Sequence, residues 1–169
     1  TVKDHKGYID IDSVEGKGTS FVLYFPVNRT AVKQEERKIT IEHYLSKGET
    51  ILVVDDVAEQ RELASAMLRK LGYATETLAS GEEAVEYLKH KPASLVILDM
   101  IMEPGIDGLE TYRKIREHRP GQKAIIVSGF AETDRVREAQ KLGAGPYLKK
   151  PYTLEKIAMA VRSELDKAA

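Results

Sequence analysis

Three stretches of sequence decide the fold: ILVVDD at residues 51–56, LVILDM at 95–100 and IIVSGF at 125–130. Each opens with aliphatic residues and then turns polar. Such near-continuous apolar runs are typical of parallel strands that helices cover on both faces. Two less regular runs, at 74–78 and 146–148, bring the number of predicted strands to five.

Amphipathic stretches with the period of a helix alternate with these runs. They lie near residues 58–71, 81–90, 108–118, 132–142 and 154–167. Ser80 and Glu83 form a capping box at the start of the second, and Gly72 and Gly143 stand where helix C-caps belong. Because crossovers between parallel strands are right-handed, this alternation predicts an α/β fold with a doubly wound five-stranded parallel sheet.

The N-terminal part has a different texture. The pattern of residues 7–26 predicts a β-hairpin. Ile9 and Ile11 alternate with acidic residues before a glycine-rich turn, and Phe21 and Leu23 alternate with Val22 and Tyr24 after it. An isolated hairpin is at best marginally stable in water. We therefore expect its apolar side chains and open edges to pack on another chain, as a homodimer through this hairpin.

A polar, charge-rich segment connects the hairpin to the α/β part. We divide the chain into a hairpin at residues 1–27, a linker at 28–48 and an α/β domain at 49–169. The linker is expected to be partly helical, from about residue 30 to residue 45.

Composition excludes several classes of protein. Among the 169 residues, 26 Lys and Arg nearly balance 27 Asp and Glu, which argues against an electrostatically driven nucleic-acid binder. The absence of cysteine excludes disulfides, thiolate chemistry and Cys-based zinc sites. No apolar run approaches the length of a membrane span. We expect a cytoplasmic domain without direct membrane contact, whether or not a parent protein is membrane-anchored.

Polar residues follow the predicted strands where function concentrates in such sheets, at their carboxyl ends. They are Asp55 and Asp56, then Asp99, Ser128 and Lys150. Three carboxylates about 4 Å apart would repel by several kcal/mol per pair unless a cation and a lysine offset them. Oxygen ligands suit Mg²⁺, with Mn²⁺ also possible, and beside such an ion one carboxylate can attack phosphorus.

Four stretches carry a resemblance to a known family. ILVVDD (51–56), LVILDM (95–100), IIVSGF (125–130) and GAGPYLKKPYT (143–153) resemble, in order and spacing, the signature stretches of chemotaxis-regulator-like response-regulator receiver domains. The resemblance implies a flavodoxin-like (βα)5 fold with strand order 2-1-3-4-5. It also implies a phosphoacceptor that serves a two-component phosphorelay.

The family's ligand set for Mg²⁺ carries over residue by residue. The resemblance implies that Asp56 and Asp99 ligate the ion directly and Asp55 through water, with the backbone carbonyl of Ile101 completing the protein ligands. The sequence departs from the family's pattern here, since DMIMEPGIDG (99–108) has one more residue, Glu103, before its proline.

The same resemblance implies the roles of the remaining site residues. Asp99 accepts a phosphoryl group from a phosphohistidine, and Ser128 and Lys150 hold the phosphoryl oxygens. Ser128 and Tyr147 form the conformational switch. Ile101 and Phe130, two residues beyond Asp99 and Ser128, are apolar, so we expect slow self-hydrolysis and a long-lived phosphorylated state.

A second resemblance concerns GYIDIDSVEGKGTSFVLYFPV (7–27), which is similar to the last hairpin of histidine-kinase ATP-binding domains. GKGTSF (16–21) matches the second glycine-rich box of that family. The order of the parts implies the C-terminal portion of a hybrid sensor histidine kinase. The other kinase motifs are missing from this sequence, so we expect it to catalyse only its own Asp phosphorylation and dephosphorylation.

Two alternatives belong to other classes. A small-molecule phosphohydrolase with an aspartyl nucleophile, like the haloacid dehalogenases, needs a second Asp where this chain has Ile101. A non-phosphorylated interaction module would not need the acidic cluster and the lysine. The expected partners are the helices of a histidine-phosphotransfer or dimerisation domain, and no nucleic acid.

Overall fold

The computed structural model describes residues 2–27, 41–129 and 134–167. The chain divides into two compact units, Thr1–Arg37 and Lys38–Ala169. Within the described ranges, no helix combines the length and the apolar character that a membrane crossing requires.

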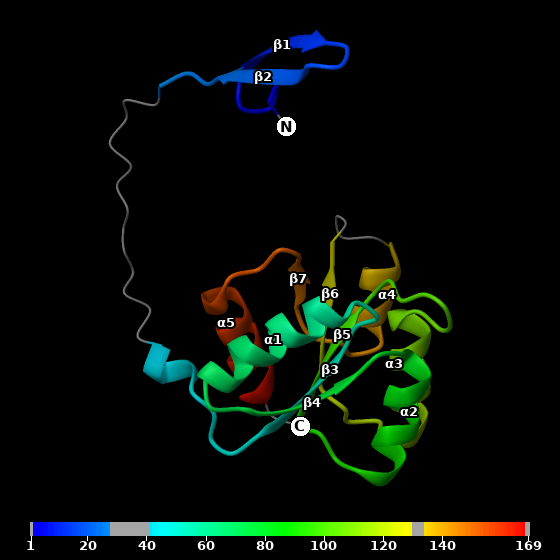
Figure 1. Cartoon of the computed structure of the whole chain (residues 1–169). Coiled ribbons are helices and arrows are strands. Elements are labelled where there is room, and N and C mark those ends of the chain that lie inside the picture. Colours follow the sequence, from blue (N-terminus) through cyan, green and yellow to red (C-terminus); the bar gives the residue numbers. More distant parts are fainter. Residues whose placement is uncertain (1, 28–40, 130–133, 168–169) are drawn as a thin grey trace. The chain divides into compact units, whose positions relative to one another are not determined.

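The second unit is built on a parallel sheet of five strands in the order β4-β3-β5-β6-β7 (Figure 1). The strands are β3 (Thr50–Val54), β4 (Ala74–Leu78), β5 (Leu95–Asp99), β6 (Ala124–Ser128) and β7 (Tyr147–Lys149). Numbered within this unit, the order is 2-1-3-4-5. The predicted doubly wound, flavodoxin-like fold is therefore confirmed.

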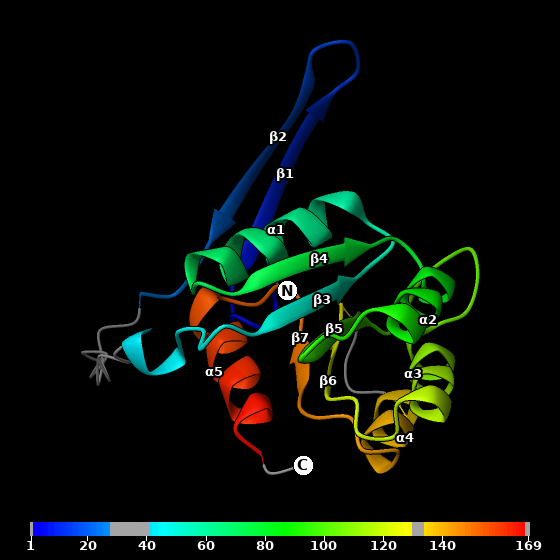
Figure 2. The same ribbon diagram turned by 90° about the horizontal axis from the view of Figure 1, so that it is seen from below.

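Helices cover both faces of this sheet. They are α1 (Ala58–Lys70), α2 (Gly81–His90), α3 (Gly108–His118), α4 (Asp134–Lys141) and α5 (Leu154–Leu165). Figure 2 shows α1 and α5 on one face and α2, α3 and α4 on the other. The chain changes face between α1 and α2 and again between α4 and α5, which is the double winding that the alternating pattern predicted.

Local signals at the helix ends agree with the sequence. The hydroxyl of Ser80 accepts a hydrogen bond from the Glu83 amide, as the predicted capping box requires. In a capping box the Glu83 carboxylate would accept a hydrogen bond from the amide of Ser80. Here it accepts from the amide of Ala79, one residue earlier. Gly72 and Gly143 have φ of 84° and 102°, the left-handed conformation that favours glycine after a helix.

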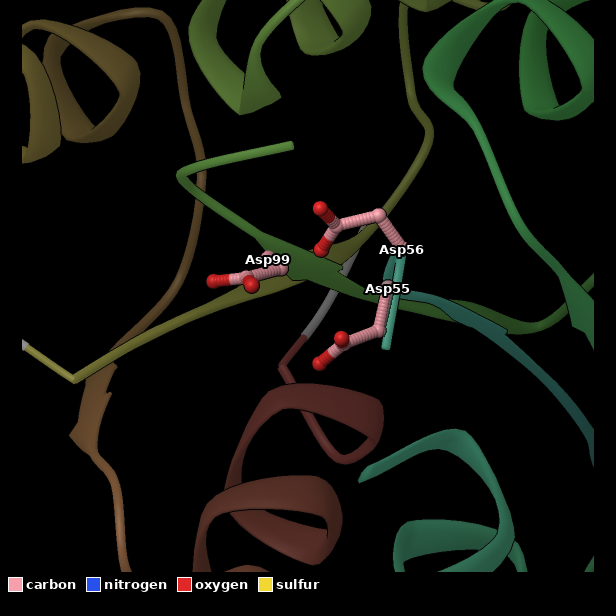
Figure 3. A group of neighbouring side chains, drawn as sticks. All are labelled: Asp55, Asp56 and Asp99. Atoms are coloured by element: carbon pink, nitrogen blue, oxygen red, sulfur yellow. The ribbon is translucent and has the colours of Figure 1, made fainter. Parts of the chain in front are cut away.

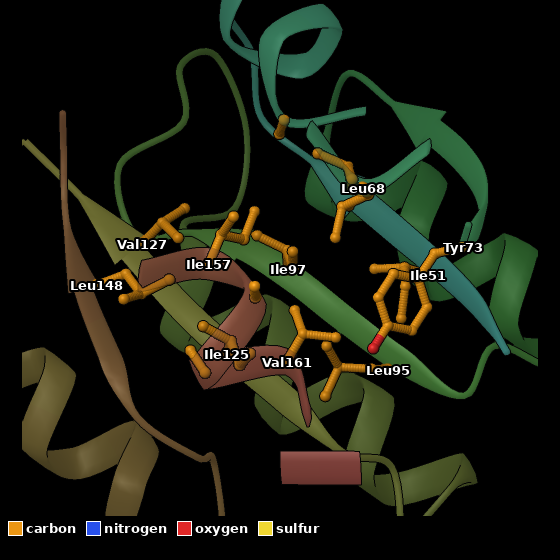
Figure 4. Close-up of a cluster of buried hydrophobic side chains, with 14 of the residues drawn as sticks. Ile51, Leu68, Tyr73, Leu95, Ile97, Ile125, Val127, Leu148, Ile157 and Val161 are labelled. Atoms are coloured by element: carbon orange, nitrogen blue, oxygen red, sulfur yellow. The ribbon is translucent and has the colours of Figure 1, made fainter. Parts of the chain in front are cut away.

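The sheet separates two hydrophobic clusters. Ile51 and Val53 of β3 belong to the cluster under α1 and α5, whereas Leu52 and Val54 belong to the cluster under α2, α3 and α4. Figure 4 shows the first of these, where side chains of the two helices cover the sheet. Since both faces of β3, β5 and β6 are covered, these strands consist almost entirely of aliphatic residues.

The first unit contains the predicted hairpin. β1 (Tyr8–Val14) and β2 (Gly18–Tyr24) pair antiparallel, with Ile9 opposite Leu23 and Ile11 opposite Phe21. These four side chains share one face of the hairpin, because side chains alternate along a strand. All four are exposed within the described residues.

Residues 41–49 belong to the second unit and pack against its C-terminal helix. A short 3-10 helix, η1 (Ile41–Tyr44), lies against α5, and the hydroxyl of Tyr73 donates to the carbonyl of Tyr44. Glu49 pairs with Arg162 of α5 at 2.7 Å. The predicted linker helix therefore survives only as η1 among the described residues, while residues 28–40 lie outside them. The domain boundaries at 27/28 and 48/49 stay predictions.

Candidate active site

The carboxyl ends of the strands bring the predicted polar residues together. Asp55 and Asp56 directly follow β3, Asp99 is the last residue of β5 and Ser128 is the last residue of β6. Lys150 directly follows β7. Asp99 and Ser128 are only 6% and 2% exposed, so their side chains lie in the protein and not on an open surface.

The three aspartates form a compact acidic cluster. Each offers one carboxylate oxygen, and these three atoms lie within 4.8 Å of one another. Figure 3 shows the side chains gathered at the ends of β3 and β5. A set of closely spaced carboxylate oxygens suits a hard divalent cation such as Mg²⁺ and offers nothing to a soft metal. The donor set therefore fits the predicted metal.

Lys150 bridges two members of the cluster. Its ammonium donates to Oδ2 of Asp55 at 2.5 Å and to Oδ2 of Asp99 at 2.9 Å. Burial alone would lower the pKa of Lys150, but the two carboxylates outweigh it, so that pKa lies above its ordinary value. The lysine therefore stays charged beside the acids. Its backbone amide donates to the Ser128 carbonyl at 2.8 Å, which ties the lysine to the end of β6.

The environment of Asp99 disfavours the charged form of its carboxylate. Burial raises its pKa, the hydrogen bond and charge of Lys150 oppose that rise, and the neighbouring charge of Asp55 adds to it. The pKa of Asp99 remains raised overall. A cation bound beside this carboxylate would relieve both the desolvation and the repulsion.

Backbone contacts orient the other two carboxylates. Asp55 accepts from the amide of Val57 at 3.0 Å, and its carbonyl accepts from the guanidinium of Arg61 at 2.5 Å. Asp56 accepts from the amide of Glu103 at 3.2 Å. The sequence pattern did not indicate that Arg61 or the Glu103 amide would be part of the site. Neither contact has a local sequence signal, because Arg61 reaches back from α1 to the Asp55 carbonyl and the Glu103 amide meets Asp56 through the path of the loop after β5.

The other residues that the sequence assigned to the site are Tyr147, Ile101 and Phe130. The hydroxyl of half-buried Tyr147 faces the carbonyl of Ser128 at 3.5 Å. Ile101 is 45% exposed, in the loop that follows Asp99. It lines a groove of about 330 Å³ together with Ser128 and Arg135. Phe130, predicted to flank the path of water, lies outside the described residues.

Gly108 explains how α3 can begin beside the acidic cluster. A Cβ on this residue would lie 2.3 Å from the Asp99 carbonyl oxygen and 2.8 Å from the Met100 Cα. Only glycine lets the helix start this close to the end of β5. Its amide donates to the Met100 carbonyl at 3.1 Å, which closes the loop of residues 101–107. The DG pair at 107–108 is the local sequence signal that could have identified this contact.

Comparisons with known proteins cover most of the chain. A family profile described as "Response regulator receiver domain" matches residues 51–162. The sensor kinase CckA of Brucella abortus is 31% identical over an alignment of 175 residues in length, and the alignment covers 98% of this chain and 18% of that protein. The sporulation initiation phosphotransferase F of Bacillus subtilis is 33% identical over 118 residues, or 70% of this chain and 94% of that protein.

Solved structures agree with these matches. A CheY-like response regulator receiver domain protein from Methanospirillum hungatei superimposes with a TM-score of 0.66 at 27% identity. The superposition covers 70% of this chain and 94% of that one. This chain thus spans less than a fifth of the sensor kinase but nearly the whole of the two small proteins. With its fold, its acidic cluster and these matches taken together, the chain belongs to the response regulator receiver domain family.

Proposed function

We propose that this receiver domain accepts a phosphoryl group from a phosphohistidine on the carboxylate of Asp99 and switches conformation as a result. The observation that carries the proposal is the shared ammonium: Lys150 donates to both Asp99 and Asp55 inside a cluster of three carboxylates. This arrangement holds two buried carboxylates next to a fixed positive charge, at the sheet edge where α/β folds bind ligands.

Receiver domains bind Mg²⁺ through acidic residues, and this chain has such residues in its Asp cluster. In our proposal Asp56 and Asp99 hold the ion directly and Asp55 holds it through water, with the Ile101 carbonyl as a further ligand. Mn²⁺ has the same ligand preference and could replace Mg²⁺. When bound, the ion supplies positive charge that offsets the negative charge of the phosphoryl oxygens.

The chain's own residues carry the remaining steps of the transfer. An oxygen of Asp99 attacks the phosphorus, the P–N bond to the donor imidazole breaks, and its electron pair stays with the imidazole nitrogen. The ammonium of Lys150 and the hydroxyl of Ser128 then hold the phosphoryl oxygens. Catalysis of phosphoryl transfer rests mainly on positioning and electrostatics, and these prearranged groups supply both kinds of contribution.

The proposed switch links Ser128 to Tyr147. The Tyr147 hydroxyl now faces the carbonyl of Ser128. Movement of Ser128 toward a phosphoryl group would change that contact, so the tyrosine ring is in a position to respond to phosphorylation. A Tyr147→Phe variant should still be phosphorylated, but its amide shifts near β7 should change less than those of the wild type.

Beryllofluoride with Mg²⁺ tests the proposal, because this ion mimics an aspartyl phosphate. In amide NMR spectra of the full chain, signals near Asp99, Ser128 and Tyr147 should shift. Asp99→Asn, which keeps the shape of the side chain, should show no such response. Transfer of labelled phosphoryl from candidate phosphohistidine donors is the direct assay. An unchanged response in Asp99→Asn would refute the assignment.

We also propose that the phosphorylated state is long-lived. The apolar side chain of Ile101 stands on the groove beside Ser128, where an attacking water would approach. Ile101→Asn should therefore speed loss of the phosphoryl group in a time course of the labelled protein. A lifetime of seconds that Ile101→Asn leaves unaltered would contradict the idea.

Receiver domains interact with histidine kinases and phosphotransfer proteins. For this chain we propose that its partner is the helix pair of a phosphotransfer or dimerisation domain, within or beside a hybrid sensor histidine kinase. The exposed hairpin face is proposed to join two copies of the chain. Phe21→Asp should then lower the mass measured by light scattering, whereas a wild-type monomer at high concentration would refute the dimer.

A further inference from the structure

Glu82 lies outside the predicted site but contacts the loop that follows Asp99. It stands in the first turn of α2, and its Oε1 accepts a hydrogen bond from the amide of Ile106 at 2.9 Å. That hydrogen bond is also the main reason why the pKa of Glu82 lies below its ordinary value. Gly105, one residue earlier, has φ of 120°. A Cβ there would lie 2.7 Å from Oε1 of Glu82, so the carboxylate packs directly on the loop backbone.

The start of α2 supports the loop by close packing as well. A Cβ on Gly81 would lie 2.7 Å from Cγ1 of Ile106 and 1.9 Å from Oγ1 of Thr111. The first residue of α2 therefore touches both the loop of residues 101–107 and the first turns of α3. Glu82 and its hydrogen bond are exposed, but they lie directly beside this close contact of Gly81 with the same loop.

The same loop reaches the acidic cluster three residues earlier. The amide of Glu103 donates to Oδ2 of Asp56, one of the carboxylates proposed to hold Mg²⁺. Ile101, whose carbonyl is another proposed ligand, lies at the start of the loop. A line of contacts thus runs from Glu82 through Ile106 and Glu103 to Asp56. Because the loop carries one metal ligand and orients another, its position affects both.

We propose that Glu82 is a positioning residue for the metal site: by accepting from Ile106 it fixes the loop of residues 101–107 and so orients Asp56 and the Ile101 carbonyl. This inference rests on the proposed function of the acidic cluster. Glu82 touches neither the metal nor the phosphoryl group. It acts only through the loop, and partners of this outer kind tune metal affinity without supplying a ligand.

A set of matched variants separates this role from simpler ones. Glu82→Ala removes the acceptor, Glu82→Gln removes the charge but keeps an oxygen acceptor, and Glu82→Asp keeps the charge but shortens the reach. Glu83→Ala is the control, because Glu83 is the next residue in the same helical turn and accepts from Ala79 instead of from the loop. Urea unfolding of each variant shows whether it is folded.

Two measurements on the full chain test the proposal. Hydrogen exchange of the Ile106 and Glu103 amides, without metal, should speed up in Glu82→Ala and Glu82→Asp and stay unchanged in Glu83→Ala. A Mg²⁺ titration followed by amide shifts should give a Kd about 3- to 10-fold weaker in the first two variants. This is less than the tenfold or more that loss of a direct partner of a ligand costs. Glu82→Gln should stay within about twofold of the wild type.

The outcomes distinguish the possible failures. Equal Mg²⁺ affinity in Glu82→Ala and Glu83→Ala would overturn the proposal. So would equal weakening in Glu82→Gln and Glu82→Ala, because the effect would then come from charge and not from the hydrogen bond. Failure of the wild-type chain to bind Mg²⁺ would refute the proposed function itself, and this role with it.

Discussion

Replacing Lys150 by methionine should destabilise the metal-free protein strongly at neutral pH. Methionine keeps most of the apolar stem but removes the ammonium that bridges Asp55 and Asp99. At 2.5 and 2.9 Å and an effective dielectric near 20, each attraction amounts to about 6 kcal/mol before desolvation is subtracted. The Lys150 side chain is only 13% exposed, so solvent replaces little of the loss. Removal of one partner from a buried pair typically costs about 3–5 kcal/mol.

The sign of the pH dependence follows from the carboxylates that remain. Burial already raises the pKa of Asp99, and loss of the lysine removes the term that opposes this rise. The folded variant therefore binds a proton more tightly than the unfolded chain does, so its stability rises as the pH falls toward the ordinary pKa of an aspartate. Added Mg²⁺ should also restore stability, because a cation replaces the missing charge.

Equilibrium urea unfolding, followed by far-UV circular dichroism at pH 7 and pH 5 with and without Mg²⁺, measures both effects. The exposed neighbour Lys149 is the matched control, and Lys149→Met should change stability by less than about 0.5 kcal/mol. The reasoning is refuted if Lys150→Met is as stable as the wild type at pH 7, or if its deficit is the same under all four conditions.

Three further predictions concern the metal, a glycine and an ion pair. Mg²⁺ at about 100 times its Kd should stabilise the protein by about 2.7 kcal/mol, and Asp56→Asn should reduce this gain to about 1 kcal/mol or less in urea unfolding. Gly108→Ala should lower the free energy of unfolding by about 2–3 kcal/mol, because its Cβ would clash with the Asp99 carbonyl, whereas Gly121→Ala should be nearly neutral since that Cβ meets open space. Although burial alone would raise it, hydrogen bonds from a backbone amide and from α5 lower the pKa of Glu49 to about 2. Its contribution is complete above its ordinary pKa of 4.5 and is lost as the pH falls toward 2. Allowing for solvent screening, Glu49→Gln should remove about 1–2 kcal/mol of acid-dependent stability between these pH values; an unchanged acid limb would contradict the pairing.

Periodicity was sufficient to predict the elements of the receiver unit. The helices at 81–90 and 108–118 were predicted with the bounds that α2 and α3 have, since caps mark their first turns. The strands with covered faces were equally clear, because a run such as 95–98 contains only aliphatic residues. The short β7 at Tyr147–Lys149 was shifted by a residue from its predicted range. A three-residue strand has too few side chains to set its own register.

The site was predictable as a gathering of residues but not as a set of contacts. Topology alone places Asp55, Asp99 and Lys150 at one sheet edge, so their proximity follows from the order of the strands. Which carboxylates the lysine bridges depends on side-chain reach, which no pattern encodes. The amide of Glu103 that meets Asp56 and the Glu82 contact on Ile106 depend on the path of an irregular loop.

The packing of residues 41–49 on the receiver unit was missed for a related reason. Their sequence is polar, and a polar composition indicates a linker unless a buried partner is known. That partner is Arg162, a charged residue near the end of α5 that is almost fully buried and pairs with Glu49. Only the folded chain brings these residues together, as they are 113 positions apart.

The burial of β3, β5 and β6 on both faces limits how the length of such a domain can change. Ile51 and Leu52 lie in the two different cores, on opposite faces of the sheet. If the pairing of β3 shifted by one residue, each of these side chains would move to the other face, and both cores would receive side chains of the wrong shape. An insertion in a strand is therefore harmful along its whole length, whereas an insertion in a connecting loop is absorbed locally. Glu103, the additional residue of this chain, lies in such a loop beside the acidic cluster. Variation in length is thus confined to the loops at the rim of the sheet, and the two cores stay intact.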